Sequence, residues 1–300
     1  MVWNRTHVEA LSPHDTPWEA VTVEGIPDGL TARLLSIDEG DGALTAELRI
    51  PAGWEFNENW SLETDLDFYV VRGELRVGET GLVRNDFSSR PAGYVNGPIV
   101  AVSDSMILVF AQGTPKVSVH DRAGSSQLDR AYRDVILKLP AMDVPAKPPL
   151  TDREVKPNIF SRTLKLNPIT GERFFITGSS PASNDEQRGD PRIEWHECVE
   201  EIYALDNWVS MDAPNDTLRL DPGWYCFRPP GIPHGPFRAG EATELATLFR
   251  VSSTLTNNYV DMDESKQLWT DYPAESLFPG VRARIGDDFK GVNPNLGCAG

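Results

Sequence analysis

Cysteine, basic residues and long apolar runs are all scarce in this 300-residue chain. Cys198, Cys226 and Cys298 form no CxxC pair and no even framework, so we expect neither a disulfide scaffold nor a structural zinc site. Lys and Arg number 28 against 45 Asp and Glu, and the net charge of -17 argues against a nucleic-acid partner because it repels phosphates. No apolar run reaches the length of a membrane span, and residues 1–21 carry charges where a signal peptide would be apolar. We therefore expect a soluble, cytoplasmic protein that does not bind membranes.

Helical patterns are also scarce, whereas turn residues are plentiful, with 24 glycines and 24 prolines. Short apolar or β-branched runs separate the turns, for example Leu44–Ile50, Phe68–Val71, Ile99–Val102 and Met106–Phe110. This rhythm is typical of an all-β sandwich or barrel. Only two stretches favour a helix, residues 128–136, where Leu128, Tyr132 and Ile136 recur at four-residue spacing, and residues 261–270.

The length of the chain is sufficient for two domains of ordinary size. Five prolines fall within residues 140–157 among small or polar residues, which indicates a stiff linker. The predicted organisation is an N-terminal extension, a first β domain, the linker, a second β domain and a C-terminal tail, at residues 1–24, 25–139, 140–157, 158–258 and 259–300.

An internal repeat supports two copies of one β domain. Three groups of residues recur in order, at spacings of 129, 134 and 138 positions. The first pairs Arg33, Leu35, Ile37, Asp38 and Gly42 with Arg162, Leu164, Leu166, Asn167 and Gly171; the second pairs Asp67, Phe68, Tyr69 and Gly73 with Glu201, Ile202, Tyr203 and Asn207; the third pairs residues 90–98 with residues 228–236. The spacing only grows, as it would if loop insertions accumulated in the second copy.

In the second copy, a turn of proline and glycine comes just before His234. Proline fixes φ and glycine permits a positive φ, so this turn can aim the histidine into the mouth of a barrel. Upstream, a strand over residues 193–205 would place Glu194, His196, Cys198 and Glu200 on one face. Two imidazoles and a carboxylate converging from neighbouring strands would form an open site for Fe(II), Mn(II), Ni(II) or Zn(II).

The turn and its histidine resemble the second motif of the cupin superfamily, G(x)5PxG(x)2H, followed by an asparagine. Its positions are filled here by Gly223, Pro229, Gly231 and His234, and Arg238 stands in place of the asparagine. The resemblance implies tandem cupin barrels, that is, double-stranded β-helix or jelly-roll domains.

The first cupin motif, G(x)5HxH(x)3-4E(x)6G, is matched in part. His196 stands in the second histidine place and Glu200 in the glutamate place, whereas Glu194 replaces the first histidine. The resemblance therefore implies that His196, Glu200 and His234 are the metal ligands, and the replacement at Glu194 leaves the metal's identity open.

The first copy resembles the same fold, but other residues stand at the positions of the metal ligands. Trp60, Leu62 and Leu66 occupy the ligand places of its first motif, and Asn96 replaces the histidine of its second. The chain is thus similar to a bicupin with one degenerate barrel and one metal-binding barrel.

Several residues of the second copy have alternative roles. Glu194 could be a fourth ligand, a general base beside the metal or a rim carboxylate. Glu200 and Glu201 point to opposite faces of a strand, and the spacing favours Glu200 as the inward one. Cys198 fits a small core residue, and Arg228 fits a structural pairing role better than a substrate clamp. Three histidines outside both motifs are assigned to the surface: His7, His14 and His120.

The resemblance implies a metal-dependent enzyme, and a 2-His-1-carboxylate group is the arrangement that non-haem Fe(II) oxygenases use. We expect Fe(II), a small organic substrate, Glu194 as the catalytic acid or base, and a monomer or homodimer. The alternatives are a non-redox isomerase, hydrolase or lyase that uses Mn(II), Ni(II) or Zn(II), and a non-catalytic ligand-binding or sensor protein.

Replacing Asn96 by alanine is expected to leave the metal content unchanged, because the first copy lacks ligands at the corresponding positions. Elemental analysis of the purified variant gives the number of metal ions per chain. Loss of half the metal would show that the first copy also holds an ion.

Overall fold

The computed structural model describes residues 5–122, 135–147, 159–179, 193–206, 209–213, 216–232, 234, 237–239, 242–260 and 283–285. Strands provide nearly all the regular structure of these residues, and their helical part is a single 3-10 turn, η1 (Ala141–Asp143). The predicted all-β class is therefore confirmed. Among the described residues, no helix has the length and hydropathy needed to cross a membrane.

One of the two predicted helices reaches into the described residues. Its last apolar position, Ile136, begins strand β14 (Ile136–Pro140), which pairs with β10 (Asp86–Arg90). The helix prediction is wrong at this residue, because pairing with a neighbouring strand overrides a weak local pattern. Residues 128 and 132, and the second predicted helix at residues 261–270, lie outside the described residues.

The chain divides into two compact units. The first comprises the described residues from Thr16 to Asp143, and the second comprises Arg5–Asp15 together with the described residues from Val144 onward. Each unit has its own sheets and is described by itself below.

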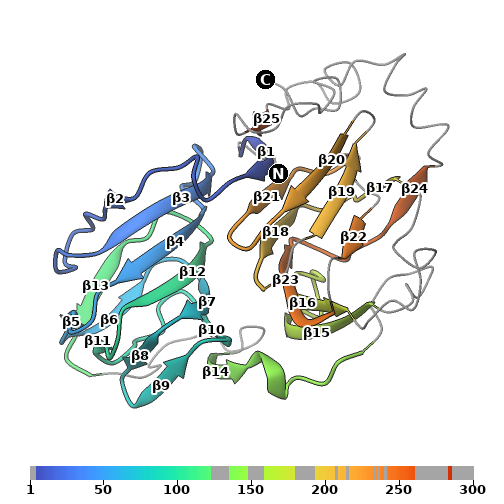
Figure 1. The fold of residues 1–300 in the computed structure, drawn as a ribbon. Coiled ribbons are helices and arrows are strands. Elements are labelled where there is room, and N and C mark those ends of the chain that lie inside the picture. The colour runs from blue at the N-terminus through green and yellow to red at the C-terminus, as the bar shows by residue number, and fades with distance from the viewer. Residues whose placement is uncertain are drawn as a thin grey trace. The chain divides into compact units, whose positions relative to one another are not determined.

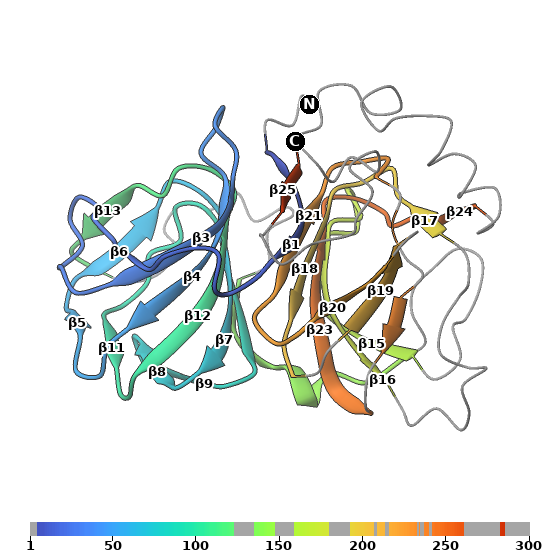
Figure 2. The same ribbon diagram turned by 45° about the horizontal axis from the view of Figure 1, so that its top comes forward.

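The first unit is built from three antiparallel sheets (Figure 1). A seven-stranded sheet has the order β14-β10-β7-β12-β4-β3-β2, a four-stranded sheet has the order β5-β11-β8-β9, and β6 pairs with β13. The other strands are β2 (Glu19–Ala20), β3 (Thr31–Ile37), β4 (Leu44–Ile50), β5 (Glu55–Phe56), β6 (Asn59–Leu62), β7 (Leu66–Arg72), β8 (Glu74–Val77), β9 (Thr80–Val83), β11 (Ile99–Ala101), β12 (Ser105–Ala111) and β13 (Val117–His120). Figure 2 shows them curving around a common interior.

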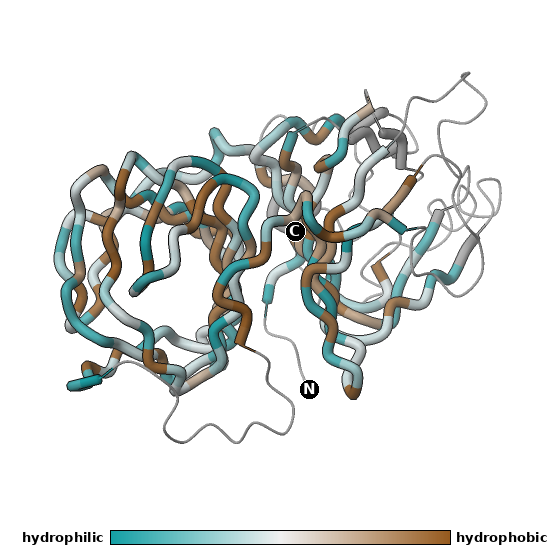
Figure 3. The backbone as a smooth tube through the Cα atoms, turned by 90° about the horizontal axis from the view of Figure 1, so that it is seen from below, coloured by the Kyte–Doolittle hydropathy of each residue, from teal (hydrophilic) through white to brown (hydrophobic). Residues whose placement is uncertain are grey.

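Apolar side chains fill the interior of the first unit. Its buried cluster includes Trp60, Phe68, Leu75 and Val77. Strand β8 shows the alternation that produces this core, because Leu75 and Val77 are buried while the residues between and before them are exposed. In Figure 3, apolar and hydrophilic stretches accordingly alternate along the backbone of this unit.

The second unit repeats this plan with a seven-stranded sheet of order β15-β16-β23-β18-β21-β1-β25, a three-stranded sheet of order β20-β19-β22, and a pair formed by β17 and β24. Its strands are β1 (His7–Leu11), β15 (Ile159–Leu166), β16 (Arg173–Ser179), β17 (Ile193–Trp195), β18 (Glu200–Ala204), β19 (Val209–Ala213), β20 (Asp216–Leu220), β21 (Tyr225–Arg228), β22 (Phe237–Ala239), β23 (Thr243–Val251), β24 (Asn258–Val260) and β25 (Ala283–Ile285). The pairing between β1 and β25 is parallel, and the others in this unit are antiparallel.

Strand β1 comes from the start of the chain yet belongs to the second unit. It lies antiparallel to β21, with Val8 opposite Phe227. It falls within the predicted N-terminal extension, residues 1–24, and β25 falls within the predicted tail. His7, assigned to the surface from sequence, is instead fully buried in β1. The sequence position of a strand does not reveal which sheet it joins, and this is why the burial of His7 was missed.

The backbone confirms the internal repeat. The N–H of Gly42 donates to the carbonyl of Asp38 at 2.9 Å, and the N–H of Gly171 donates to the carbonyl of Asn167 at the same distance. The two glycines have φ values of 75° and 76°, a left-handed conformation that favours glycine. The matched residues therefore form the same turn in both units.

A buried ionic cluster ties Arg5, just before β1, to β18, β21 and β23 of the second unit. Glu201 accepts hydrogen bonds from Arg5 Nη1 at 3.0 Å, from Arg250 Nη1 at 2.6 Å and from the Tyr225 hydroxyl at 2.6 Å. Arg250 also donates to Glu172 at 2.9 Å. Burial alone would lower the pKa of Arg250, but the carboxylates of Glu201 and Glu172 raise it above its ordinary value. Arg250 is therefore held charged inside the fold.

Replacing Glu201 by alanine is expected to lower the free energy of unfolding by about 3–5 kcal/mol, because it removes the carboxylate shared by two buried guanidinium groups. Chemical denaturation of the variant and the wild type measures the difference. The exposed pair of Lys116 and Glu63, 3.8 Å apart, supplies the control, since Lys116→Ala should change stability by less than about 0.5 kcal/mol. Equal effects of the two substitutions would contradict this account.

Candidate metal centre

The turn before His234 is fixed by backbone hydrogen bonds. Gly231 has a φ of 86°, and its N–H donates to the carbonyl of His196 at 2.7 Å. The N–H of His234 donates to the carbonyl of Glu194, and the N–H of Glu194 donates to the carbonyl of His234, both at 2.9 Å. This reciprocal pair sets Glu194 and His234 directly opposite each other on adjacent segments, so their side chains share one face.

The predicted continuous strand over residues 193–205 is wrong. Strand β17 ends at Trp195 and β18 begins at Glu200. Between them, the carbonyl of His196 accepts from the glycine turn, and the N–H of Val199 donates to the Ser252 hydroxyl at 3.0 Å. Loops therefore take the hydrogen bonds that a neighbouring strand would supply.

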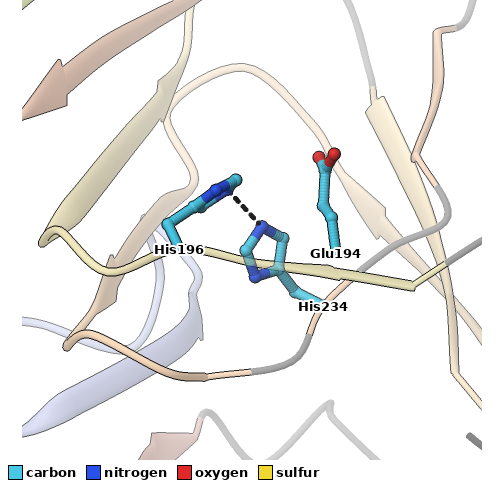
Figure 4. A group of neighbouring side chains, drawn as sticks. All are labelled: Glu194, His196 and His234. Carbon is cyan, nitrogen blue, oxygen red and sulfur yellow. Dashed lines mark hydrogen bonds between the residues drawn. The ribbon is translucent and has the colours of Figure 1, made fainter. Parts of the chain in front are cut away.

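The two histidine side chains point at each other inside the second unit (Figure 4). His234 Nδ1 lies 2.8 Å from the carbonyl oxygen of Ile232, and His196 Nδ1 lies 3.2 Å from that of Thr256. A carbonyl oxygen only accepts, so each Nδ1 is the protonated nitrogen and donates. The lone pairs of the two Nε2 atoms then face each other, 3.1 Å apart.

This arrangement fits a cation. Two neutral imidazoles with opposed lone pairs repel, whereas a proton or a metal ion between them removes the repulsion. Two nitrogens bound to one metal ion at about 2.1 Å lie roughly 3.0–3.4 Å apart for ordinary coordination angles. The observed separation of 3.1 Å falls in that range. Nδ1 hydrogen bonds to backbone carbonyls are also the usual support of metal-binding histidines.

Two carboxylates flank the imidazoles. The ligand atoms of Glu194, His196 and His234 all lie within 4.8 Å of one another, and all three residues are buried. Glu200 Oε1 lies 3.6 Å from His196 Nε2, and Glu200 Oε2 lies 3.4 Å from His234 Nε2. Glu200 therefore lies beside both imidazoles, and the group whose ligand atoms all lie within 4.8 Å of one another consists of Glu194, His196 and His234.

The two carboxylates have different partners. Glu200 Oε2 accepts a hydrogen bond from Arg228 Nη1 at 2.8 Å, and both side chains are buried. Arg228 thus has the structural pairing role predicted for it. Glu194 Oε2 instead accepts a hydrogen bond from the amide of Asn257 at 3.2 Å. Glu200 is thus paired with a guanidinium group, and Glu194 is hydrogen-bonded to an amide.

The remaining candidates have other partners. Glu201 belongs to the buried ionic cluster with Arg5 and Arg250. Cys198 packs in a buried cluster with Phe175 and Val251, as predicted for a small core residue. Burial, followed by the nearby Glu200 charge, raises the pKa of Cys198 to about 12. The thiolate that a metal would need is therefore disfavoured.

The first unit repeats the frame of the site with other side chains. Trp60 and Asn96 exchange the same reciprocal backbone hydrogen bonds as Glu194 and His234, at 3.0 and 2.7 Å. The N–H of Gly93 donates to the carbonyl of Leu62 at 2.8 Å, as Gly231 does to His196. No group of three potential metal ligands is found among the described residues of this unit.

Comparison with solved structures identifies the architecture. A candidate dioxygenase from Nostoc punctiforme superposes with a TM-score of 0.71 at 17% identity, covering 87% of this chain and 88% of that one. The protein folds as a bicupin. Protein Ylba from E. coli matches this chain with a TM-score of 0.54 at 15% identity, over 84% of this chain and 95% of that one. The R92A mutant of Bacillus subtilis oxalate decarboxylase matches this chain with a TM-score of 0.52 at 12% identity, over 88% of this chain and 81% of that one.

At these identities the likeness is one of fold. No protein-family model matches this sequence, and no curated protein matches it. Its chemistry therefore has to be inferred from its own residues. Sequence reasoning missed one of these, Asn257, whose amide contacts Glu194. An extension of the growing repeat spacing past residue 250 was the signal that could have drawn attention to it.

The raised pKa of Cys198 predicts that the native protein protects this thiol from alkylation. At pH 8 the group is almost wholly protonated and buried, so iodoacetamide should modify it only after denaturation. Mass spectrometry of peptides from native and unfolded samples measures the modified fraction. Rapid native labelling of Cys198 would contradict the burial and pKa described above.

Proposed function

We propose that this bicupin is a metal-dependent enzyme, and that it is an Fe(II) oxygenase acting on a small organic substrate. The observation that carries the proposal is the opposed pair of Nε2 atoms, 3.1 Å apart and flanked by two carboxylates. A 2-His-carboxylate group is the ligand set of non-haem Fe(II) oxygenases. The fold likeness to a candidate dioxygenase over nearly the whole of both chains supports the same reading.

In this proposal His196, Glu200 and His234 hold the metal. Glu194 lies within the same 4.8 Å group as both imidazoles, so we propose that it completes the set as a fourth ligand rather than remaining a free base. Bound Fe(II) would supply the redox chemistry that activates O₂ toward an organic substrate.

Residues around the site orient the imidazoles, adjust the net charge and exclude water. The carbonyls of Ile232 and Thr256 fix both imidazole rings with Nε2 turned inward. Arg228 offsets the charge of Glu200, so that the two carboxylates and the guanidinium group together carry one net negative charge, which attracts a divalent ion. Burial of the four groups excludes bulk water and strengthens their electrostatic attraction for a cation.

One observation favours a second candidate function. Two carboxylates instead of one make the group richer in oxygen, and oxygen ligands suit Mn(II). A Mn(II) ion at this site would act as a Lewis acid in a non-redox reaction such as isomerisation or decarboxylation.

Replacing His234 by alanine is expected to abolish stoichiometric metal binding, because it removes one of the two opposed imidazoles. The circular dichroism spectrum should stay unchanged, since the turn is held by backbone hydrogen bonds. Metal content by elemental analysis measures the loss. His120→Ala is the control: His120 Nε2 contacts the Ser61 hydroxyl at 2.8 Å in the first unit, and this variant should retain its metal. Gross unfolding of the His234 variant would contradict the expectation.

A measurement of oxygen consumption distinguishes the two functions. Metal-free protein loaded with Fe(II) or Mn(II) is tested against a panel of small organic acids and phenols in an oxygen electrode. Substrate-dependent uptake with Fe(II) supports the oxygenase. Substrate conversion without uptake supports the non-redox enzyme, and binding without conversion would overturn both and favour a sensor.

A further inference from the structure

Two consecutive residues of the second unit support two different groups of the metal centre. The carbonyl of Thr256 accepts from His196 Nδ1 at 3.2 Å, and Asn257 Nδ2 donates to Glu194 Oε2 at 3.2 Å. Asn257 is buried. Both residues belong to the connection between β23 and β24, so a single short segment orients an imidazole and a carboxylate.

Strand pairing explains how Asn257 reaches Glu194. Strands β17 and β24 are antiparallel, with Trp195 opposite Asn258 and Glu194 opposite Tyr259. Asn257 precedes β24 directly, and it is therefore diagonal to Glu194 on the facing strand, where cross-strand side chains make contact. Its neighbour Asn258 donates instead to the carbonyl of Trp195, at 3.5 Å.

The first unit contains the same pair of strands with other side chains. In its β6 and β13, Trp60 lies opposite Val119, Ser61 opposite Ser118 and Leu62 opposite Val117. Superposing the two registers places Trp60 at the position of Glu194.

The same registers place Val117 at the position of Asn257 and Ser118 at that of Asn258. Val117 packs against the apolar cluster that contains Trp60. The buried amide thus accompanies the buried carboxylate in one unit, and both are apolar in the other. This joint replacement links the amide to the metal centre, and its hydrogen bond to Oε2 links it to Glu194.

The Asn257 amide, which is neutral, also differs from the charged guanidinium group of Arg228 that supports Glu200. Arg228 brings a full positive charge to Glu200 and offsets its negative charge. A neutral amide orients an oxygen of Glu194 and leaves its charge in place for a cation. A hydrogen bond of this kind orients a carboxylate ligand without neutralising it.

We propose that Asn257 is a positioning residue that holds the Glu194 carboxylate against the two imidazoles and thereby strengthens metal binding through Glu194. The proposal rests on the metal centre described above. It assigns to the connection between β23 and β24 a direct influence on metal affinity.

The test is the dissociation constant of Mn(II), measured by calorimetry on the full chain after removal of metal. Asn257→Val, which copies the first unit, is expected to weaken binding about 10-fold to 100-fold, the usual range for loss of such a support. Asn258→Ser copies the first unit at the neighbouring position and should leave the Kd within about 2-fold of wild type. Asn257→Ala, which removes the amide without adding methyl groups, should reproduce the loss if the valine variant folds poorly.

A double-mutant cycle separates positioning from a general structural effect. If Asn257 acts through Glu194, Asn257→Val should cause no further loss of Mn(II) affinity in a protein that already carries Glu194→Ala, which removes the acceptor of the Asn257 hydrogen bond. An equal loss in both backgrounds would overturn the proposal, as would wild-type affinity in the valine and alanine variants.

Metal binding by the wild-type protein distinguishes this proposal from the function on which it rests. Wild-type protein that binds neither Mn(II) nor Fe(II) overturns the metal centre itself. Wild-type protein that binds Mn(II) tightly, with Asn257 variants that bind equally well, leaves the metal centre in place and overturns only the role of Asn257.

Discussion

Two imidazole nitrogens, Nε2 of His196 and Nε2 of His234, meet 3.1 Å apart inside the second unit, and the surrounding structure serves to keep them there. Each ring is locked by a carbonyl oxygen on its other nitrogen, so neither can turn away to relieve the repulsion. The carboxylates at their side add negative charge. These buried lone pairs and carboxylates repel one another, and a bound cation would replace that repulsion with attraction. The site therefore favours cation binding.

A comparison of the two units shows that the same backbone arrangement forms with or without the potential metal ligands. The reciprocal bonds between Glu194 and His234 have an equivalent between Trp60 and Asn96, and the glycine turns match as well. Where one unit points charged and polar groups inward, the other packs Trp60 into an apolar cluster. Backbone geometry therefore determines where a site can be, and the side chains determine whether one is present.

Much of the fold and the site could be predicted because it depends on local patterns. Turn residues between short apolar runs indicated an all-β chain, and the growing spacing of matched residues revealed the repeat. The motif around Gly231 and His234 indicated the corner from which a histidine points inward. Each of these signals lies within a few residues of the feature it predicts.

The errors and omissions share a different cause. The break between β17 and β18 is made by hydrogen bonds to distant loops, the burial of His7 follows from pairing with β21, and Ile136 is a strand residue because β10 lies beside it. Asn257 contacts Glu194 across 63 positions of sequence. These features depend on contacts between segments far apart in the chain, which periodicity does not report.

The pairing of β1 with β21 has a consequence for how the molecule is made. Val8 leaves the ribosome early, but its partner Phe227 is synthesised more than two hundred residues later. The central sheet of the second unit therefore stays incomplete through most of translation, and closing so long a loop makes its assembly a late and slow step. Until β21 is made, β1 lacks its antiparallel partner, and an unpaired strand is the kind of surface on which nascent chains aggregate.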